Sequence, residues 1–325
     1  MAELKQSDHL ICSQMKDATT DLVLLYLAHF GGVFARINIE DQITEFSCYL
    51  GESRLEDRIT LSCKDKSINI NGETRLWYRR GNFSIPKINC ENSELRRHLA
   101  DEHAIFKSFL HKHVTYVGNY DREKHNNKLI NLGIARDCGL KIPRTVVTCR
   151  KTDLEWLGNN GQGIVCKPIH NGHIYYEEEQ ELVYSPGIIL LNEEKINEMP
   201  EKFGLSKFQE YISKRIELRI FFIFDNIYAM AIFSQLDEMT KYDFRNYNKE
   251  KPNRNVPYNL PFRILSKVKD FISCSGLTTG SIDMILSENN EYVFLEVNPS
   301  GQFGWVSANC NYYIEKEIAT KILTK

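Results

Sequence analysis

The stretch FLEVNPSGQFGW, residues 294–305, ends a hydrophobic strand with side chains that can bind a metal ion. Its partner in a predicted antiparallel hairpin is GSIDMILS, residues 280–287, and the two fold back about the loop Glu288–Glu291. In this register Asp283 faces Glu296, so two carboxylates meet where like charges repel each other. A divalent cation between them would remove the repulsion, and the pair therefore predicts a metal site.

The two faces of this predicted hairpin differ in character. One face is wholly apolar and is expected to lie in the core. Its facing pairs are Ile282 with Val297, Met284 with Leu295, and Leu286 with Val293. On the other face Ser281 meets Asn298 and, nearer the loop, Ile285 meets Phe294. The polar part of this face is therefore confined to one end.

Asp283, Glu296 and Asn298 offer only oxygen ligands. Such a set suits Mg²⁺, which takes a few carboxylates and completes its octahedron with water and substrate phosphates. The alternative is a solvated polar strand end that binds no metal.

The segments of the first half predict a mixed α/β lobe. Strand patterns at 9–14 and 32–40 flank a helical pattern at 21–30, which Gly31 and Gly32 close. Further strand patterns follow, joined by short polar turns, at 45–50, 58–63, 67–70 and 74–80. A long helix is expected over 93–113 and leads to a strand at 114–119.

The second half continues with alternating elements. A helix is expected over 124–138, where Gly139 stops it, and strands are expected at 145–149 and 163–168. The run 219–235 has two apolar, β-rich halves about a two-residue Asp225–Asn226 turn, which indicates a hairpin. A further helix is expected to begin at Pro261 and to end at Gly276.

Composition limits the class of protein. A chain of 325 residues with 42% hydrophobic content can bury a sizeable core and has room for two or three domains. Its 41 basic and 43 acidic residues give a net charge of −2, which provides no global field for nucleic acid or an anionic membrane.

Cysteines and hydropathy bear on the compartment. The nine cysteines include no C-x-x-C pair, which argues against a disulfide framework or a zinc ribbon and fits a reducing cytosol. No apolar run approaches the ~18 residues of a membrane helix, and no signal-type segment opens the chain. We therefore expect a cytoplasmic protein with neither nucleic acid nor membrane as partner.

The hairpin, with Asp on one strand and Glu-x-Asn on the other, resembles the metal site of the ATP-grasp ligases. Two earlier segments resemble the same family, in the same order. NNKLINLGIARDCGLKIPRT, residues 126–145, is similar to the start of the ATP-grasp nucleotide site, which implies Lys128 as a phosphate ligand. GIVCKP, residues 163–168, is similar to the strand that carries the second lysine, here Lys167.

The segment KFQEYISKRIELRIFF, residues 207–222, resembles the part of the ATP-grasp site that receives the nucleotide. The resemblance implies that Glu217 holds the ribose, that Arg219 faces the phosphates, and that adenine meets the chain at Gln209, Glu210, Tyr211 and Ile212. Six residues separate Glu210 from Glu217, which is the spacing of the adenine-side and ribose-binding glutamates in related ligases such as the D-alanine ligases. The alternative is an ordinary surface strand and turn.

Moving the γ-phosphoryl group of ATP needs cations around it, because the nucleotide carries about four negative charges. Lys167, Arg219 and Arg245 are the residues expected to act on the transferring phosphate, and arginine suits this role because its planar fork pairs with phosphate oxygens. For Lys167 the alternative is an edge-strand lysine that blocks aggregation. For Lys128 it is a solvated helix face.

Over essentially its whole length the sequence resembles the graspetide maturases, the microviridin-type peptide ligases, and it looks most like the maturase of grasp-with-spasm systems. The segments that carry this resemblance are TTDLVLLYL (19–27), LWYRRGNF (76–83), FSQLDEMTKYDFRNYN (233–248), PNRNVPYNLP (252–261) and the NPSGQFGW ending. Within WYRR, Arg79 and Arg80 suit stacking and packing between lobes at least as well as a role in the site.

The resemblance implies an α/β protein with the ATP-grasp fold. Its expected parts are an N-terminal pre-ATP-grasp α/β domain over 1–115, a central ATP-grasp subdomain over 116–205 and a C-terminal ATP-grasp subdomain over 206–325. It also implies an enzyme that uses ATP and Mg²⁺ to phosphorylate Asp or Glu side chains of a ribosomally made precursor peptide, and then forms ω-ester or ω-amide macrocycles. A leader in the precursor is expected to dock while the core is modified.

Two other functions stay open. One is a ligase of free amino acids or peptides, similar to the glutathione synthetases. The other is a nucleotide-binding regulatory module without turnover. The sequence is compatible with a homodimer but does not determine the oligomeric state.

Overall fold

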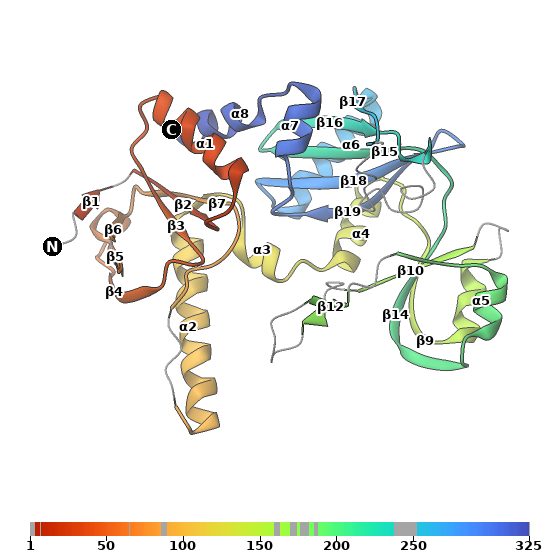
Figure 1. The fold of residues 1–325 in the computed structure, drawn as a ribbon, viewed down its shortest axis with the longest axis horizontal. Coiled ribbons are helices and arrows are strands. Elements are labelled where there is room, and N and C mark those ends of the chain that lie inside the picture. The colour runs from red at the N-terminus through yellow and green to blue at the C-terminus, as the bar shows by residue number, and fades with distance from the viewer. Residues whose placement is uncertain are drawn as a thin grey trace.

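In the computed structural model, the strands of the described residues form five sheets (Figure 1). The description leaves out residues 1–3, 7, 65, 86–89, 159–162, 170–173, 176–181, 185–187, 237–251 and 325. Arg245, which the sequence predicts to act on phosphates, therefore lies outside the described residues. No helix in the described ranges is both long and apolar enough to cross a bilayer.

The N-terminal part combines a parallel sheet with a second, mostly antiparallel one. The parallel sheet has the order β3-β2-β7-β8, with bounds Phe34–Asn38, His9–Ser13, Arg75–Tyr78 and Thr115–Val117. The second has the order β1-β6-β5-β4, with bounds Leu4–Gln6, Lys66–Asn71, Arg58–Cys63 and Ile43–Tyr49. The helical elements of the N-terminal part are α1 (Ala18–His29), a 3₁₀ turn (Arg54–Glu56) and α2 (Ser93–Val114). Helix α2 projects away from the other elements (Figure 1).

A small antiparallel sheet of order β13-β10-β14-β9 forms the central part. Its strands are β9 (Thr145–Arg150), β10 (Ile164–Lys167), β13 (Ile189–Leu191) and β14 (Lys202–Glu210). One face carries a separate apolar core that includes Leu157, Ile164 and Phe208. The 3₁₀ helix Lys151–Leu157 and α5 (Glu193–Glu198) contribute to this core, and β11 (Ile174–Tyr175) and β12 (Leu182–Tyr184) form a short hairpin.

The C-terminal part is built on a sheet of order β17-β16-β15-β18-β19. Its strands are β15 (Lys214–Ile223), β16 (Asn226–Ile232), β17 (Asn255–Pro257), β18 (Thr279–Ser287) and β19 (Tyr292–Asn298). A 3₁₀ turn (Ser234–Leu236) follows β16. Helices α4 (Lys128–Asp137) and α6 (Phe262–Ser275) cover one face, where Leu132 and Val268 share a core with Leu218 and Ile282.

The other face of this sheet packs against the N-terminal part. Phe221 and Ile223 of β15 share a core with Ile11 and Trp77 of the N-terminal sheet, and helices α7 (Gly304–Cys310) and α8 (Ile314–Leu323) complete it. Figure 1 shows α8 beside α1 at this contact. Burial of this apolar surface ties the two parts together, so residues of the N-terminal part can support a site on the C-terminal sheet.

The β18–β19 hairpin confirms part of the predicted register. Asp283 faces Glu296, Ser281 faces Asn298 and Ile282 faces Val297. Beyond Asp283 the register shifts by one residue, so the predicted pairs of Met284 with Leu295, Ile285 with Phe294, and Leu286 with Val293 are wrong. The observed partners are Phe294 for Met284, Val293 for Ile285, and Tyr292 for Leu286.

A bulge at Leu295 causes this shift. It turns Phe294 into the core, where its ring centroid lies 4.8 Å from that of Phe271, while Leu295 stays partly exposed. Burying the larger aromatic ring explains why the strand accepts an extra residue here.

Two other predicted elements differ in detail. The helix expected over 124–138 is two helices, α3 (Tyr120–Lys124) and α4, because Asn127 caps a new helix by accepting from the Leu129 and Ile130 N–H groups at 3.0 and 3.2 Å. The β15–β16 turn consists of Phe224 and Asp225 rather than Asp225 and Asn226, since Asn226 already pairs with Ile223.

The sheets also bear on the domain boundaries. Strand β8 belongs to the N-terminal sheet as far as Val117, and β14 belongs to the central sheet as far as Glu210. We therefore propose boundaries after Val117 and after Glu210, in place of those expected after 115 and 205.

Candidate active site

Three charged side chains form a row across one end of the C-terminal sheet. Arg219 on β15 pairs in register with Asp283 on β18, which in turn pairs with Glu296 on β19. Arg219 Nη1 donates to both carboxylate oxygens of Asp283, at 2.7 and 2.9 Å. The row lies on the same face as Phe221, so that face is apolar where the N-terminal part covers it and charged where it does not.

Lys128 extends the row from the other side. Its Nζ lies 3.0 Å from Glu296 Oε2. The start of α4 is fastened at this point because Asn126 Nδ2 donates to the Val297 carbonyl at 3.1 Å and Asn131 Nδ2 donates to Asn126 Oδ1 at 2.7 Å. Each carboxylate of the predicted repulsive pair therefore has a cation of its own.

The three residues predicted to bind metal come together. Asn298 Nδ2 lies 3.5 Å from Asp283 Oδ2, beside Glu296. Burial raises the pKa of Asp283, the nearby Glu296 charge adds to the rise, and Arg219 opposes it. A divalent cation between the carboxylates would favour their charged form.

This donor set fits Mg²⁺ that is shared with another ligand. With one oxygen from each, two carboxylates and one amide leave half of an octahedron unfilled, and the described residues hold no group of three or more His, Cys, Asp or Glu side chains that could hold a metal ion. Water and phosphate oxygens are the usual remaining ligands of Mg²⁺. We therefore expect metal and nucleotide to bind together.

Lysines gather on one face of the central sheet. Lys167, at the end of β10, stands directly opposite Lys207 on β14. Burial first, and then the charges of Lys128 and Lys167, lower the pKa of Lys207 to about 8, while Glu296 opposes the shift. Lys207 is therefore close enough to Lys128, Lys167 and Glu296 for their charges to act on it.

Sequence reasoning missed Lys207. Its segment was recognised as part of the nucleotide site, but the residue itself was not singled out. Only the strand pairing brings it opposite Lys167, forty residues away in the chain. Within the sequence Lys207 stands between Ser206 and Phe208, so its neighbours gave no signal of its role.

The residues expected to meet adenine lie where the chain passes from β14 to β15. Gln209 is buried and donates through Nε2 to Thr145 Oγ1 at 3.0 Å. The Glu210 carboxylate accepts from the Arg144 N–H and Nε, both at 2.8 Å. The Tyr211 N–H donates to the Gly163 carbonyl at 3.3 Å, so this group is engaged within the protein, and Ile212 follows it half-buried.

Glu217 is held rigidly two residues before Arg219, on the same face of β15. Its Oε1 accepts from Lys214 Nζ at 2.7 Å and from Ser234 Oγ at 2.5 Å, and both partners are buried. A carboxylate fixed in this way is suited to accept bonds from ligand hydroxyls.

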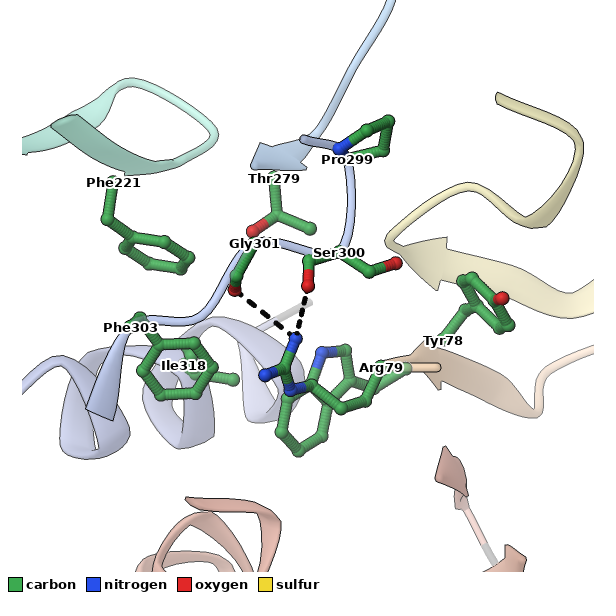
Figure 2. A pocket seen from close by; sticks show the side chains of 10 residues that line it. Tyr78, Arg79, Phe221, Thr279, Pro299, Ser300, Gly301, Phe303 and Ile318 are labelled. Carbon is green, nitrogen blue, oxygen red and sulfur yellow. Dashed lines mark hydrogen bonds between the residues drawn. The ribbon is translucent and has the colours of Figure 1, made fainter. Parts of the chain in front are cut away.

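Arg79 reaches the site from the N-terminal part (Figure 2). Its Nη1 donates to the Ser300 carbonyl at 2.9 Å and to the Gly301 carbonyl at 3.3 Å, in the loop that directly follows Asn298. Its guanidinium lies 5.1 Å from the Phe303 ring centroid, and its Nε lies 3.6 Å from Asp17. Arg79 therefore packs between the two parts, as considered from the sequence, and it also holds the loop next to the residues predicted to bind the metal ion.

Carboxylates and cations therefore come together where the C-terminal and central sheets meet, because the charges of Glu296 and Lys128 act on Lys207 of the central sheet. Arg219 is 7% exposed and its Nε has no hydrogen-bond partner among the described residues. Buried cations and carboxylates in this arrangement suit a polyphosphate bound together with a divalent metal.

Comparison with known proteins agrees with this geometry. No protein-family model matches the sequence, and no curated protein does. Among solved structures, the RiPP-associated ATP-grasp ligase of Chryseobacterium gregarium, in complex with ADP and a leader and core peptide, matches with a TM-score of 0.78 at 25% identity, over 97% of this chain and 94% of its own. The chain has the ATP-grasp fold.

Two further ATP-grasp-type structures match over almost the full length. The macrocyclase MdnC of Microcystis aeruginosa, bound with the precursor peptide MdnA, has a TM-score of 0.77 at 24% identity, over 98% of this chain and 99% of its own. The ATP-grasp ligase PsnB, complexed with a phosphomimetic variant of a minimal precursor, Mg and ADP, has a TM-score of 0.70 at 15% identity, over 99% of both chains. The predicted fold class, ATP-grasp with an N-terminal α/β lobe, is confirmed.

Proposed function

We propose that this ATP-grasp protein is a graspetide maturase. It phosphorylates Asp or Glu side-chain carboxylates of a ribosomally made precursor peptide and joins them to hydroxyls or amines as ω-ester or ω-amide links. The observation that carries the proposal is the row Arg219–Asp283–Glu296–Lys128, together with Lys207, which lies opposite Lys167 and feels the charges of Lys128 and Glu296. This row supplies carboxylates for a metal beside cations for phosphates, as phosphoryl transfer requires.

In the proposed reaction a carboxylate oxygen of the peptide attacks the γ-phosphorus of ATP and ADP leaves. A Ser or Thr hydroxyl or a Lys amine then attacks the acyl carbon. Phosphate leaves with the former carboxylate oxygen, and the nucleophile loses its proton. Lys128, Lys167 and Arg219 would stabilise the charge that develops on the transferring phosphoryl group, and Arg245 remains a proposed fourth cation.

Metal and nucleotide have proposed positions in this site. Asp283, Glu296 and Asn298 would hold Mg²⁺, which neutralises charge between phosphates when bound. Glu217 would accept the ribose hydroxyls. Gln209 to Ile212 would border adenine, with Tyr211 contributing through groups other than its engaged N–H.

The proposed partner is a precursor with a leader and a core. The match to the Chryseobacterium gregarium ligase, solved with both kinds of peptide, supports this proposal. A docked leader raises the effective concentration of the core, so core residues can vary between substrates. A reducing cytoplasm suits the nine free cysteines, and nucleic acid and membrane are not proposed as partners. A homodimer is the assembly that we propose.

The direct test uses a small peptide rich in Thr or Ser and Glu or Asp, encoded beside this gene. With Mg-ATP it should lose one water for each link formed and release one ADP per link, and the leaderless core should react much more slowly. Lys167→Met should slow the mass loss by ~10²–10³, and Lys202→Met, at an exposed position on β14, should not. Strong ADP release with free amino acids or dipeptides, and none with the precursor, would identify a metabolite ligase instead.

A further inference from the structure

Lys207 is a buried cation that has no counter-ion among the described residues. It is 4% exposed, and no hydrogen bond or ion pair joins its ammonium group to another described residue. Lys214 shows the usual arrangement, because it is 8% exposed and pairs with Glu217 at 2.7 Å. Burying a charge without a partner is costly, so an unpaired buried lysine indicates a ligand that supplies the missing charge.

The surroundings of Lys207 are positive. Lys167 stands directly opposite it on the neighbouring strand, and the charges of Lys128 and Lys167 both lower its pKa. Glu296 acts in the other direction, but it is already paired with Lys128 at 3.0 Å. The charges that act on Lys207 are therefore mostly positive, and no described carboxylate pairs with its ammonium group.

Position on the strand identifies the kind of anion. Lys207 precedes Glu210 by three residues, which is about 10 Å along β14. It thus lies beyond the segment proposed to border adenine and toward the carboxylates proposed to hold Mg²⁺. A chain of phosphates would run through this place.

We infer that Lys207 is a third phosphate-binding lysine, which contacts the same polyphosphate chain as Lys128 and Lys167. This inference rests on the proposed function, because it requires a nucleotide bound beside these lysines. Lys207 opens the segment that resembles the nucleotide site, but the resemblance gives this lysine no role of its own. The bound polyphosphate supplies the counter-charge that Lys207 otherwise lacks.

The test compares Lys207→Met with Lys207→Arg and with Lys202→Met, an exposed lysine on the same strand. Three ligands are titrated: ADP, inorganic tripolyphosphate and adenosine, which has no phosphate. We expect Lys207→Met to weaken the binding of ADP and of tripolyphosphate about ten- to a hundredfold, which is the range for one charge-assisted hydrogen bond. The affinity for adenosine should not change. Lys207→Arg should retain most of the affinity, and Lys202→Met should match the wild type.

A second readout separates binding from a structural role. Removing an unpaired buried charge should raise the melting temperature of the ligand-free protein, whereas removing a structural contact would lower it. Lys207→Gln is measured in the same way, so that the result does not depend on one variant folding. A lower melting temperature for both variants, together with unchanged ADP affinity, overturns the inference.

The outcome also distinguishes this inference from the proposed function. If the wild type binds neither ADP nor tripolyphosphate, both fail. If the wild type binds them and Lys207→Met binds them equally well, only the assignment of Lys207 fails.

Discussion

Lys128 and Glu296 form an ion pair of 3.0 Å that links the start of α4 to β19. Lys128 is a proposed phosphate ligand and Glu296 is a proposed metal ligand. The ion pair therefore joins the phosphate-binding and metal-binding parts of the site. A metal–nucleotide complex brings positive charge to Glu296 and negative charge to Lys128 at the same time. We therefore expect Mg²⁺ and nucleotide to strengthen each other's binding.

Glu296→Gln tests this contact. The variant should lose most of the thermal stabilisation that Mg-ADP gives the wild type, because it removes one of two carboxylates that would hold the metal. Its ligand-free stability should change by no more than ~1 kcal/mol, since Lys128 offsets the charge of Glu296 and Arg219 that of Asp283. Melting curves with and without Mg-ADP measure both effects. An Mg-ADP shift equal to that of the wild type would remove Glu296 from the metal site.

Lys167→Met should reduce turnover by ~10²–10³, the usual effect of losing one electrostatic contact to the transition state. The side chain keeps its apolar stem, so the fold should survive, as far-UV circular dichroism can check. The control is Lys202→Met, which changes an exposed lysine. ADP release at the wild-type rate by Lys167→Met would contradict the assignment.

Arg79→Met should destabilise the protein by about 2–4 kcal/mol, because it breaks the bonds to Ser300 and Gly301 and removes a counter-charge from buried Asp17. It should also weaken Mg-ADP binding, since the freed loop directly follows Asn298. The matched control is Arg97→Met at an exposed helix position, for which we expect a change within ~0.5 kcal/mol. Urea unfolding and ADP titration of both variants decide whether stability and binding fall together.

Lys207 predicts a pH dependence of stability. Burial and two neighbouring lysines lower its pKa from 10.5 to about 8 in the folded protein. Below pH 8 the group is charged in both states, so its burial penalty is present in full and Lys207→Met should be more stable than the wild type. Between pH 8 and about 10 the unfolded state binds more protons, so the wild type gains relative stability and the difference should shrink.

The facing groups Lys128, Lys167, Glu296 and Cys166 are the same in both proteins, so the comparison isolates Lys207. Unfolding free energies from denaturant titrations at pH 7, 8, 9 and 10 provide the measurement. A difference that stays constant or grows over this range would contradict the expected direction.

Local patterns were sufficient for much of the fold and for the carboxylate pair. Alternation along two strands placed Asp283 against Glu296, and Pro261 and Gly276 marked the ends of α6, where Gly276 adopts the left-handed conformation with φ 66°. These features depend on residue types within one hairpin or one helix.

Features that depend on packing were not predictable in this way. Phe294 and Leu295 are both apolar, so nothing local showed that Phe294 would enter the core beside Phe271 and force a bulge. The role of Lys207 became visible only when the strand pairing placed it opposite Lys167. The role of Arg79 likewise depends on its bond to the Ser300 carbonyl, more than two hundred residues away in the chain.

The central claim is that the enzyme activates a peptide carboxylate as an acyl-phosphate at the expense of ATP. The most direct measurement uses a precursor whose Asp and Glu side chains carry ¹⁸O, with the released phosphate examined by mass spectrometry. Each link formed should transfer one ¹⁸O atom from a carboxylate to inorganic phosphate, together with one ADP and one lost water. Linked peptide formed with unlabelled phosphate would contradict the account.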